Sequence, residues 1–307
     1  MLSWLSVPES MGSRGYYGNV GDIRNSGVEV NLTGAIIRTK DIDWTVSLNL
    51  AHNKGKILKL PASKVLDNGG FYESPYWYEE GGEMLNYMTY AYAGVDETGQ
   101  ALYWYDEDMS TLGKAASTIT NRPGKKFSGK TTDPNKANRY AHGSNAPDLF
   151  GGFSTNFRFG NFDLSLSFDY QLGGKVYDAR YQTLMTPQAS KAEGYNYHKD
   201  YIKAWSPTNT TSNIPRWQYK DKYAAQASDR WLTNASYLNF QSFTVGYTLP
   251  KNLVPYISNI RIYAAGENLY FWSKRKGLDP RYAFDRNESV NVYSPVRNIS
   301  GGVQLTF

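Results

Sequence analysis

Residues 162–172 read FDLSLSFDYQL, and apolar and polar side chains alternate through the whole stretch. The apolar positions are Phe162, Leu164, Leu166, Phe168, Tyr170 and Leu172, and the polar positions between them are Asp163, Ser165, Ser167, Asp169 and Gln171. Side chains of a β-strand point alternately to the two faces of its sheet. This period of two therefore predicts a strand with one apolar face and one polar face.

Six further stretches share this alternation, which is clear in WTVSLNLA from Trp44 and noisier between Val28 and Ile36. Together they predict strands at about 24–38, 42–54, 150–159, 161–173, 235–249, 258–272 and 296–307. The links at 39–41, 160 and 250–258 are short, whereas those at 55–149, 174–234 and 273–295 are long. Short turns at one end and long loops at the other are typical of a transmembrane antiparallel β-barrel, so we expect an all-β fold of this kind.

Some local structure is predicted inside the long loops. Residues 178–186 and 192–205 suit short helices, the second of which ends before Pro207. The stretch VDETGQALYWY predicts a hairpin with its turn at Glu97 to Gly99.

Aromatic side chains occupy both ends of the predicted apolar faces. Those at the turn ends are Trp44, Phe162 and Tyr247, and those at the loop ends are Tyr170, Tyr270 and Trp272. Two such levels are expected where a barrel crosses the two interfaces of a membrane, with apolar faces toward lipid and polar faces toward the lumen. The alternative is a soluble β protein in which these residues pack a core.

Composition excludes several classes of protein. The 307 residues include no Cys, so a disulfide scaffold, a thiolate metal site and a cysteine nucleophile are excluded. The net charge of +5 is small and evenly spread, so no nucleic-acid partner is predicted. No apolar run approaches the ~18 residues that a membrane-spanning helix requires.

Few residues suggest catalysis, and we expect neither an enzyme nor a cofactor. His52, His142 and His198 lie far apart and lack the spacing of metal ligands. Asp106, Glu107 and Asp108 form the only dense acidic cluster. Such carboxylates are used in glycoside hydrolysis and in Ca²⁺ binding, but adjacent acids at a loop tip are more often simply solvated.

Seven aromatic residues lie outside the predicted strands: Trp77, Tyr78, Tyr103, Trp104, Tyr105, Trp205 and Trp217. Flat aromatic faces stack on sugar rings, which makes these residues candidates for substrate contact. The alternative is that they pack the long loops against each other.

Four ordered blocks of sequence resemble the SusC/RagA family of TonB-dependent outer-membrane transporters. The most specific is the last: DRWLTNASYLNFQSFTVGYTLP at 229–250, NIRIYAAGENLYFWSKRKGLDP at 259–280 and PVRNISGGVQLTF at 295–307. The others are the hairpin sequence at 19–61, PDLFGGFSTNFRFGNFDLSLSFDYQLGGKVYD at 147–178 and WSPTNTTSNIPR at 205–216. The resemblance covers about Gly18 to Phe307 and fails only in the loops.

The resemblance implies a bacterial outer-membrane protein that imports nutrients, in an organism similar to Bacteroidetes. It implies uptake of an oligosaccharide or a similar nutrient, a SusD-type surface lipoprotein as partner, and energy from the TonB complex. A receptor for a siderophore, cobalamin or a peptide is the alternative within this class. A secreted carbohydrate-binding β protein is the alternative from another class.

Nothing in the chain resembles the TonB-contacting segment, the plug domain or the earlier barrel strands of that family. We therefore expect residues 1–307 to be the C-terminal portion of a barrel of about 22 strands with a plugged lumen. The first residues, MLSWLSVPESMG, do not form a signal peptide, as expected if the chain is a fragment.

The last strand resembles the final strand of outer-membrane barrels, which the barrel assembly machinery reads. Its pattern places a polar residue, a glycine, a hydrophobic residue and an aromatic residue at Ser300, Gly302, Leu305 and Phe307. We expect these residues to form a barrel-insertion signal.

Overall fold

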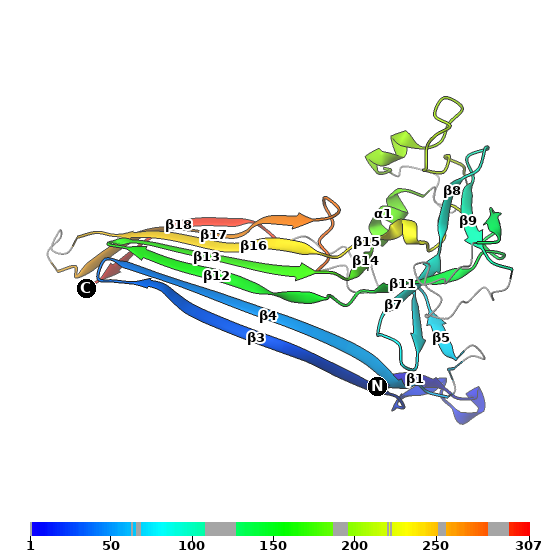
Figure 1. Ribbon diagram of the computed structural model, residues 1–307, viewed down its shortest axis with the longest axis horizontal. Coiled ribbons are helices and arrows are strands. Elements are labelled where there is room, and N and C mark those ends of the chain that lie inside the picture. Colours follow the sequence, from blue (N-terminus) through cyan, green and yellow to red (C-terminus); the bar gives the residue numbers. More distant parts are fainter. Residues whose placement is uncertain are drawn as a thin grey trace. The chain divides into compact units, whose positions relative to one another are not determined.

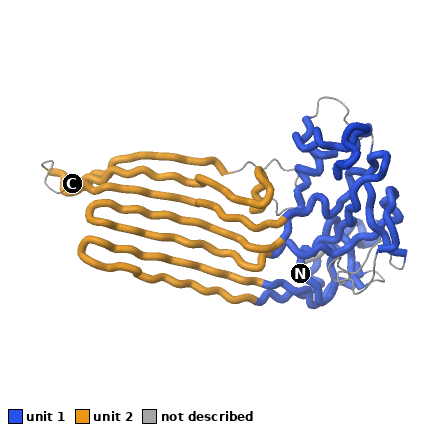
Figure 2. Tube along the Cα trace, turned by 45° about the horizontal axis from the view of Figure 1, so that its top comes forward, with its two compact units in different colours: residues 1–26, 54–146, 175–233 blue, residues 27–53, 147–174, 234–307 orange. Residues whose placement is uncertain are grey.

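The computed structural model describes residues 2–62, 64–65, 69–107, 127–186, 196–219, 221, 223–250, 256–281 and 295–307. The chain forms two compact units (Figure 2). The first, here called the loop unit, contains residues 1–26, 54–146 and 175–233. The second, the sheet unit, contains residues 27–53, 147–174 and 234–307.

The sheet unit is built on one sheet of seven antiparallel strands (Figure 1). In chain order these strands are β3 (Asp22–Arg38), β4 (Ile42–Lys59), β12 (Leu149–Phe159), β13 (Phe162–Leu172), β16 (Tyr237–Thr248), β17 (Asn259–Ser273) and β18 (Asn298–Thr306). Neighbours in the sheet follow the order of the chain from β3 to β18. All seven predicted strands are confirmed, as is the alternation of short and long connections.

Register places the alternating side chains on common faces across the whole sheet. Phe153 lies opposite Phe168, which lies opposite Phe240, and the last two rings stack with centroids 4.7 Å apart. On the other face Ser154 lies opposite Ser167, and Ser165 donates a hydrogen bond to Asn156. One face is therefore a continuous apolar surface, and the other is polar.

Two glycines on the polar face make room for long side chains from neighbouring strands. A Cβ on Gly302 would lie 2.6 Å from the hydroxyl of Tyr263, and a Cβ on Gly246 would lie 2.5 Å from Nη2 of Arg261. The Arg261 side chain therefore lies across β16 and reaches Asp163 on β13, at 2.9 Å from Nε to Oδ1. The Tyr263 ring likewise covers Gly302.

The loop unit consists of short elements. Its strands are β1 (Leu2–Ser6), β2 (Gly15–Asn19), β5 (Gly70–Glu73), β6 (Tyr76–Glu79), β7 (Asn86–Tyr90), β8 (Tyr92–Val95), β9 (Ala101–Tyr105), β10 (Gly129–Thr131), β11 (Arg139–Ser144), β14 (Lys175–Tyr177) and β15 (Leu232–Asn234). Its helices are η1 (Glu9–Met11), α1 (Ala179–Leu184), η3 (Lys199–Lys203) and η4 (Asp229–Trp231). The strands form small sheets of two to four members, such as β11-β7-β6-β5 and β10-β9-β8.

An aromatic core holds these short elements together. Its buried members are Ile57, Leu60, Phe71, Tyr76, Tyr78, Tyr87, Tyr177, Met185 and Trp231. They come from β4 and the residue after it, from the sheet of β5 to β7, and from the segment that contains α1 and η4. Elements this short bury little surface individually, so the shared core accounts for most of their stability.

The predicted loop elements are found in part. Helix α1 falls within 178–186, and Asp178 caps it by accepting a hydrogen bond from the backbone of Tyr181 at 2.8 Å. Within 192–205 the described residues form only the 3₁₀ helix η3, and 192–195 lie outside them. The hairpin of β8 and β9 is confirmed. No helix in the described ranges is both long and apolar enough to cross a membrane.

Candidate functional site

The polar face of the sheet carries a network of charged and amide side chains. Arg261 binds Asp163 through two hydrogen bonds, with 2.5 Å between Nη2 and Oδ2. Near the other end of β13, Asn239 donates a hydrogen bond of 2.6 Å to Asp169. Charge-assisted hydrogen bonds of this kind fix side-chain geometry on the polar face.

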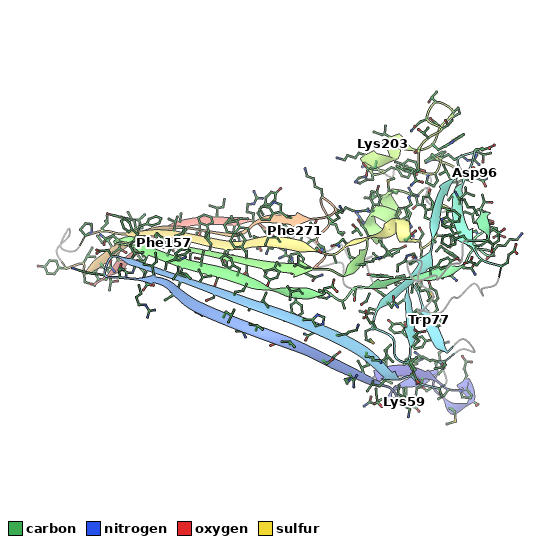
Figure 3. The ribbon with its side chains drawn as sticks, viewed as in Figure 1. Lys59, Trp77, Asp96, Phe157, Lys203 and Phe271 are labelled. Carbon is green, nitrogen blue, oxygen red and sulfur yellow. The ribbon has the colours of Figure 1, made fainter. Side chains whose placement is uncertain are left out.

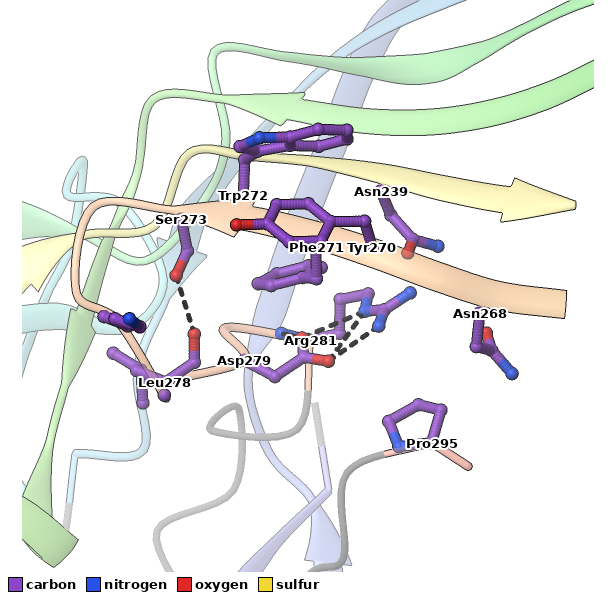
Figure 4. A pocket seen from close by; sticks show the side chains of 12 residues that line it. Asn239, Asn268, Tyr270, Phe271, Trp272, Ser273, Leu278, Asp279, Arg281 and Pro295 are labelled. Carbon is purple, nitrogen blue, oxygen red and sulfur yellow. Dashed lines mark hydrogen bonds and ion pairs between the residues drawn. The ribbon is translucent and has the colours of Figure 1, made fainter. Parts of the chain in front are cut away.

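A cavity of about 440 Å³ opens beside this network, at the end of β17 that leads into the last long loop (Figure 4). Asn239, Phe271 and Arg281 line it. The Arg281 guanidinium stacks over the Phe271 ring at 4.8 Å and pairs with Asp279, at 2.6 Å from Nη2 to Oδ2. Volumes in this range suit small-molecule subsites, and the mixture of an aromatic ring with polar groups suits a polar ligand.

Three of the seven predicted contact residues are buried inside the loop unit. Trp77 and Tyr103 are each 1% exposed and Tyr78 is 7% exposed. Tyr78 stacks on Phe71 with centroids 4.9 Å apart, and the Tyr103 hydroxyl donates a hydrogen bond to the Tyr223 carbonyl. Because neighbouring side chains cover these rings, the prediction of substrate contact is wrong for them, and they pack the loop unit.

Three more of the seven are partly buried. Trp104 stacks on Phe127 with centroids 4.7 Å apart, and the Lys130 ammonium lies 4.6 Å above the Trp104 ring. Tyr105 lies against Gly129, and Trp205 lies against Gly99 at the tip of the β8–β9 hairpin. Their rings are largely engaged by neighbours within the loop unit.

Trp217 is the predicted contact residue most accessible to a ligand, with 55% of its surface exposed. Its indole nitrogen donates a hydrogen bond to the Tyr197 hydroxyl, and Tyr197 stacks on Tyr201 with centroids 5.2 Å apart. The Tyr201 hydroxyl in turn donates to the Arg216 carbonyl. An exposed indole is thus held in place by a row of aromatic rings.

Aromatic rings of the loop unit also surround Arg230, whose terminal guanidinium nitrogens are buried. The Arg230 guanidinium is 4.4 Å from the Trp231 ring and 5.3 Å from the Tyr92 ring. Burial lowers the pKa of Arg230 and raises the pKa of Tyr92 to about 12. Cation–π contact offsets part of the cost of burying the charge.

The acidic cluster does not form an exposed pair of carboxylates in the described residues. Asp106 is 6% exposed and accepts a hydrogen bond of 2.7 Å from the Tyr140 hydroxyl, whereas Glu107 is exposed. Asp108 lies outside the described residues. Across those residues no group of three or more His, Asp or Glu side chains is arranged to hold a metal ion.

The residues predicted for the two membrane interfaces share the apolar face of the sheet. Phe162 lies opposite Tyr247 at one end, where Trp44 lies two residues inside the end of β4. At the other end Tyr170 and Trp272 both lie opposite Leu238, and Tyr270 and Trp272 are about half exposed. This placement fits the predicted interface levels, which stay a prediction.

Residues proposed for insertion lie on β18 and directly after it. Ser300 and Gly302 occupy its polar face, opposite Ala265 and Tyr263. Leu305 lies opposite Ile260 on the apolar face, and Phe307 is 85% exposed. Their role in insertion stays a prediction.

Sequence reasoning missed Tyr197 beside Trp217, and it missed Asn239, Phe271 and Arg281 around the cavity. Figure 3 shows Phe271 on the sheet, with Trp77 among the side chains of the loop unit. The run SKRKGLDPR at 273–281 contains four cationic residues and one acidic residue, which marks a charged segment but not a cavity.

No family model matches the chain. It is similar to two TonB-dependent receptors of Formosa agariphila, P3 at 28% identity over 98% of the chain and P26 at 24% over 100%. It is also 26% identical over 94% of its length to the TonB-dependent receptor SusC of Bacteroides thetaiotaomicron. The chain spans 30%, 31% and 27% of these relatives, respectively.

Two solved structures share the fold over the whole chain. One is the RagAB peptide transporter, with a TM-score of 0.74 and 24% identity. The other is the RagAB peptide importer in its closed-closed state, with a TM-score of 0.76 and 25% identity. The chain covers 32% of each matched chain.

Proposed function

We propose that this chain is the C-terminal part of a SusC-type TonB-dependent receptor and forms part of the wall of an outer-membrane nutrient transporter. The observation that carries the proposal is the seven-stranded antiparallel sheet with one apolar and one polar face. In a transporter of this kind the apolar face contacts lipid and the polar face lines the lumen. The similarity to receptors along the full chain supports the same assignment.

The substrate that we propose is an oligosaccharide. The exposed Trp217, held by Tyr197 and Tyr201, offers a rigid flat surface of the kind on which sugar rings stack. A peptide is the main alternative, because the RagAB structures are of a peptide transporter. Siderophores and cobalamin are further alternatives within the class, and a secreted carbohydrate-binding protein is the alternative outside it.

The intact protein is proposed to act with partners. A SusD-type surface lipoprotein closes the barrel from outside, and the TonB complex acts through a part of the protein outside residues 1–307. The barrel assembly machinery is proposed to read Ser300, Gly302, Leu305 and Phe307. The transporter forms and breaks no covalent bond in its substrate, so neither a catalytic residue nor a cofactor is proposed.

Deleting the gene tests the proposal. We expect the deletion strain to lose growth on one class of oligosaccharide, while growth on glucose is unchanged, and we expect loss of TonB to give the same defect. A complementing copy of the intact receptor should restore growth and co-purify with a surface lipoprotein. Unchanged uptake of every saccharide, together with loss of peptide or iron uptake, would contradict the oligosaccharide assignment.

Replacing Trp217 by Ala is expected to weaken binding of that oligosaccharide about five- to tenfold, because one stacking surface is lost. Titration calorimetry with the purified intact receptor measures the affinity. Ile202→Ala is the matched control, because Ile202 is 88% exposed in the neighbouring η3 helix and carries no ring. Equal affinity of the Trp217 variant and the wild type would remove this residue from the substrate site.

A further inference from the structure

The cavity at the end of β17 has a built polar wall. Asp169 accepts a hydrogen bond from Asn239 at 2.6 Å, and Nη1 of Arg281 lies 3.8 Å from Asp169. Arg281 also pairs with Asp279, whose side chain is only 11% exposed. These contacts neutralise most of the Arg281 charge and fix its guanidinium against Phe271.

A tight turn places a further cation beside the cavity. The backbone of Leu278 donates a hydrogen bond of 3.1 Å to the Arg275 carbonyl, and Gly277 at the third position has φ +89°. The Ser273 hydroxyl contacts the carbonyl oxygens of Arg275 and Leu278 at 2.8 Å each, which holds the base of the turn. Lys276 therefore lies at the tip of an ordered turn and lines the cavity.

Arg281 is paired with two carboxylates, and Lys276 differs from it in this respect. Within the described ranges no carboxylate forms an ion pair with Lys276, and its side chain is exposed. Lys274 and Arg275 lie next to it in the sequence, so the turn carries three cationic residues. A ligand entering this cavity meets the Lys276 ammonium, the Asn268 amide and the Phe271 ring, whereas the Asn239 amide is 2% exposed and holds Asp169 in place.

We propose that this cavity is a subsite for an acidic sugar residue, whose carboxylate binds Lys276. A ring hydroxyl of the sugar binds the Asn268 amide, and an apolar edge of the sugar ring contacts Phe271. The cavity volume of about 440 Å³ accommodates one such ring. This inference rests on the proposed function, because it names the class of oligosaccharide that binds at the polar face of the same sheet.

The test uses the purified intact receptor and two matched probes, trigalacturonate and its carboxyl-reduced neutral form. We expect the wild type to bind the acidic probe about tenfold more tightly than the neutral probe, and this preference to shrink as NaCl is raised. Lys276→Gln should remove the preference and leave the affinity for the neutral probe unchanged. Lys203→Gln is the control, since Lys203 is an exposed lysine of η3 (Figure 3), and it should keep the preference.

Equal binding of the two probes by the wild type, or equal loss in both lysine variants, overturns the inference. Tighter binding of triglutamate than of trigalacturonate overturns the assignment to a sugar. If the receptor imports a neutral oligosaccharide and Lys276→Gln changes nothing, only the inference fails. If no saccharide binds and gene deletion leaves all saccharide uptake unchanged, the proposed function fails with it.

Discussion

Replacing Trp231 by Ala is expected to destabilise the loop unit by about 3–5 kcal/mol, the usual cost of removing a large buried ring. Trp231 is 0% exposed and belongs to the core that joins β4, the β5–β7 sheet and α1. Its indole nitrogen donates a hydrogen bond of 2.9 Å to the Gln226 carbonyl, and Arg230 stacks on its ring. The variant loses the packing, leaves a cavity and removes the partner of a buried cation.

Hydrogen exchange followed by mass spectrometry on the intact receptor measures this effect locally. Protection of the β6, β7 and β14 amides is expected to fall a hundredfold or more, because each tenfold change corresponds to about 1.4 kcal/mol. Trp217→Ala removes the same side chain from an exposed position and should leave protection unchanged. Equal protection in the Trp231 variant and the wild type would show that the core does not stabilise these strands.

The sheet could be predicted from the sequence because its signal is local. Each strand shows its two faces in its own alternation, as in Phe162 to Leu172, and no knowledge of neighbouring strands is needed. The prediction ended the second strand at residue 54, whereas β4 continues to Lys59. The alternation of apolar and polar residues breaks at HNKGK (52–56), although the strand continues. The side-chain pattern therefore could not predict where this strand ends.

For the aromatic residues of the loops, residue type alone does not predict whether a side chain is buried or exposed. Trp77 and Trp217 were equally good candidates by composition, yet one is 1% exposed and the other 55%. The difference comes from the small sheets that the loops form, since Trp77 packs with Met88 and Ala141 in a minor core. Those strands are short and buried on both faces, so they show no alternation from which exposure could be read.

The cavity could not be predicted because the residues of its wall come together only through the register of neighbouring strands. Asn239 and Phe271 lie opposite each other only through the pairing of β16 with β17. A bulge between Phe240 and Ser242 shifts that pairing. The alternation changes phase there, from Leu238 and Phe240 to Phe243 and Val245, but this change does not show which residues of β17 lie opposite. Only the basic run after β17 is visible in the sequence, and its charge alone does not indicate a cavity.

Acidification below pH 6.5 is expected to destabilise the loop unit through His142. This residue lies at the irregular pairing of β11 with β7, where its Nε2 is 3.2 Å from the Thr89 carbonyl oxygen. Burial is the main cause that lowers the pKa of His142 to about 4; the contact with Thr89 opposes this shift and Lys175 adds to it. The folded state therefore keeps His142 neutral where the unfolded state takes up a proton.

The sign of the effect follows from proton uptake. Between pH 6.5 and pH 4 the unfolded state binds more protons at this site, so the free energy of unfolding falls as the pH falls and levels off below pH 4. A shift of this size corresponds to up to about 3 kcal/mol. Burial raises the pKa of Asp229, so proton uptake there stabilises the folded state and opposes His142 near the acidic end of the range.

Comparison with a variant isolates the histidine from Asp229. His142→Gln keeps a donor for the Thr89 carbonyl but takes up no proton, so its melting temperature should depend less on pH between 6.5 and 4 than that of the wild type. His52→Gln, at an exposed histidine that contacts the Asp148 carbonyl in the sheet unit, is the control and should retain the wild-type slope. Parallel pH profiles for the His142 variant and the wild type would show that His142 does not link protonation to the stability of the loop unit.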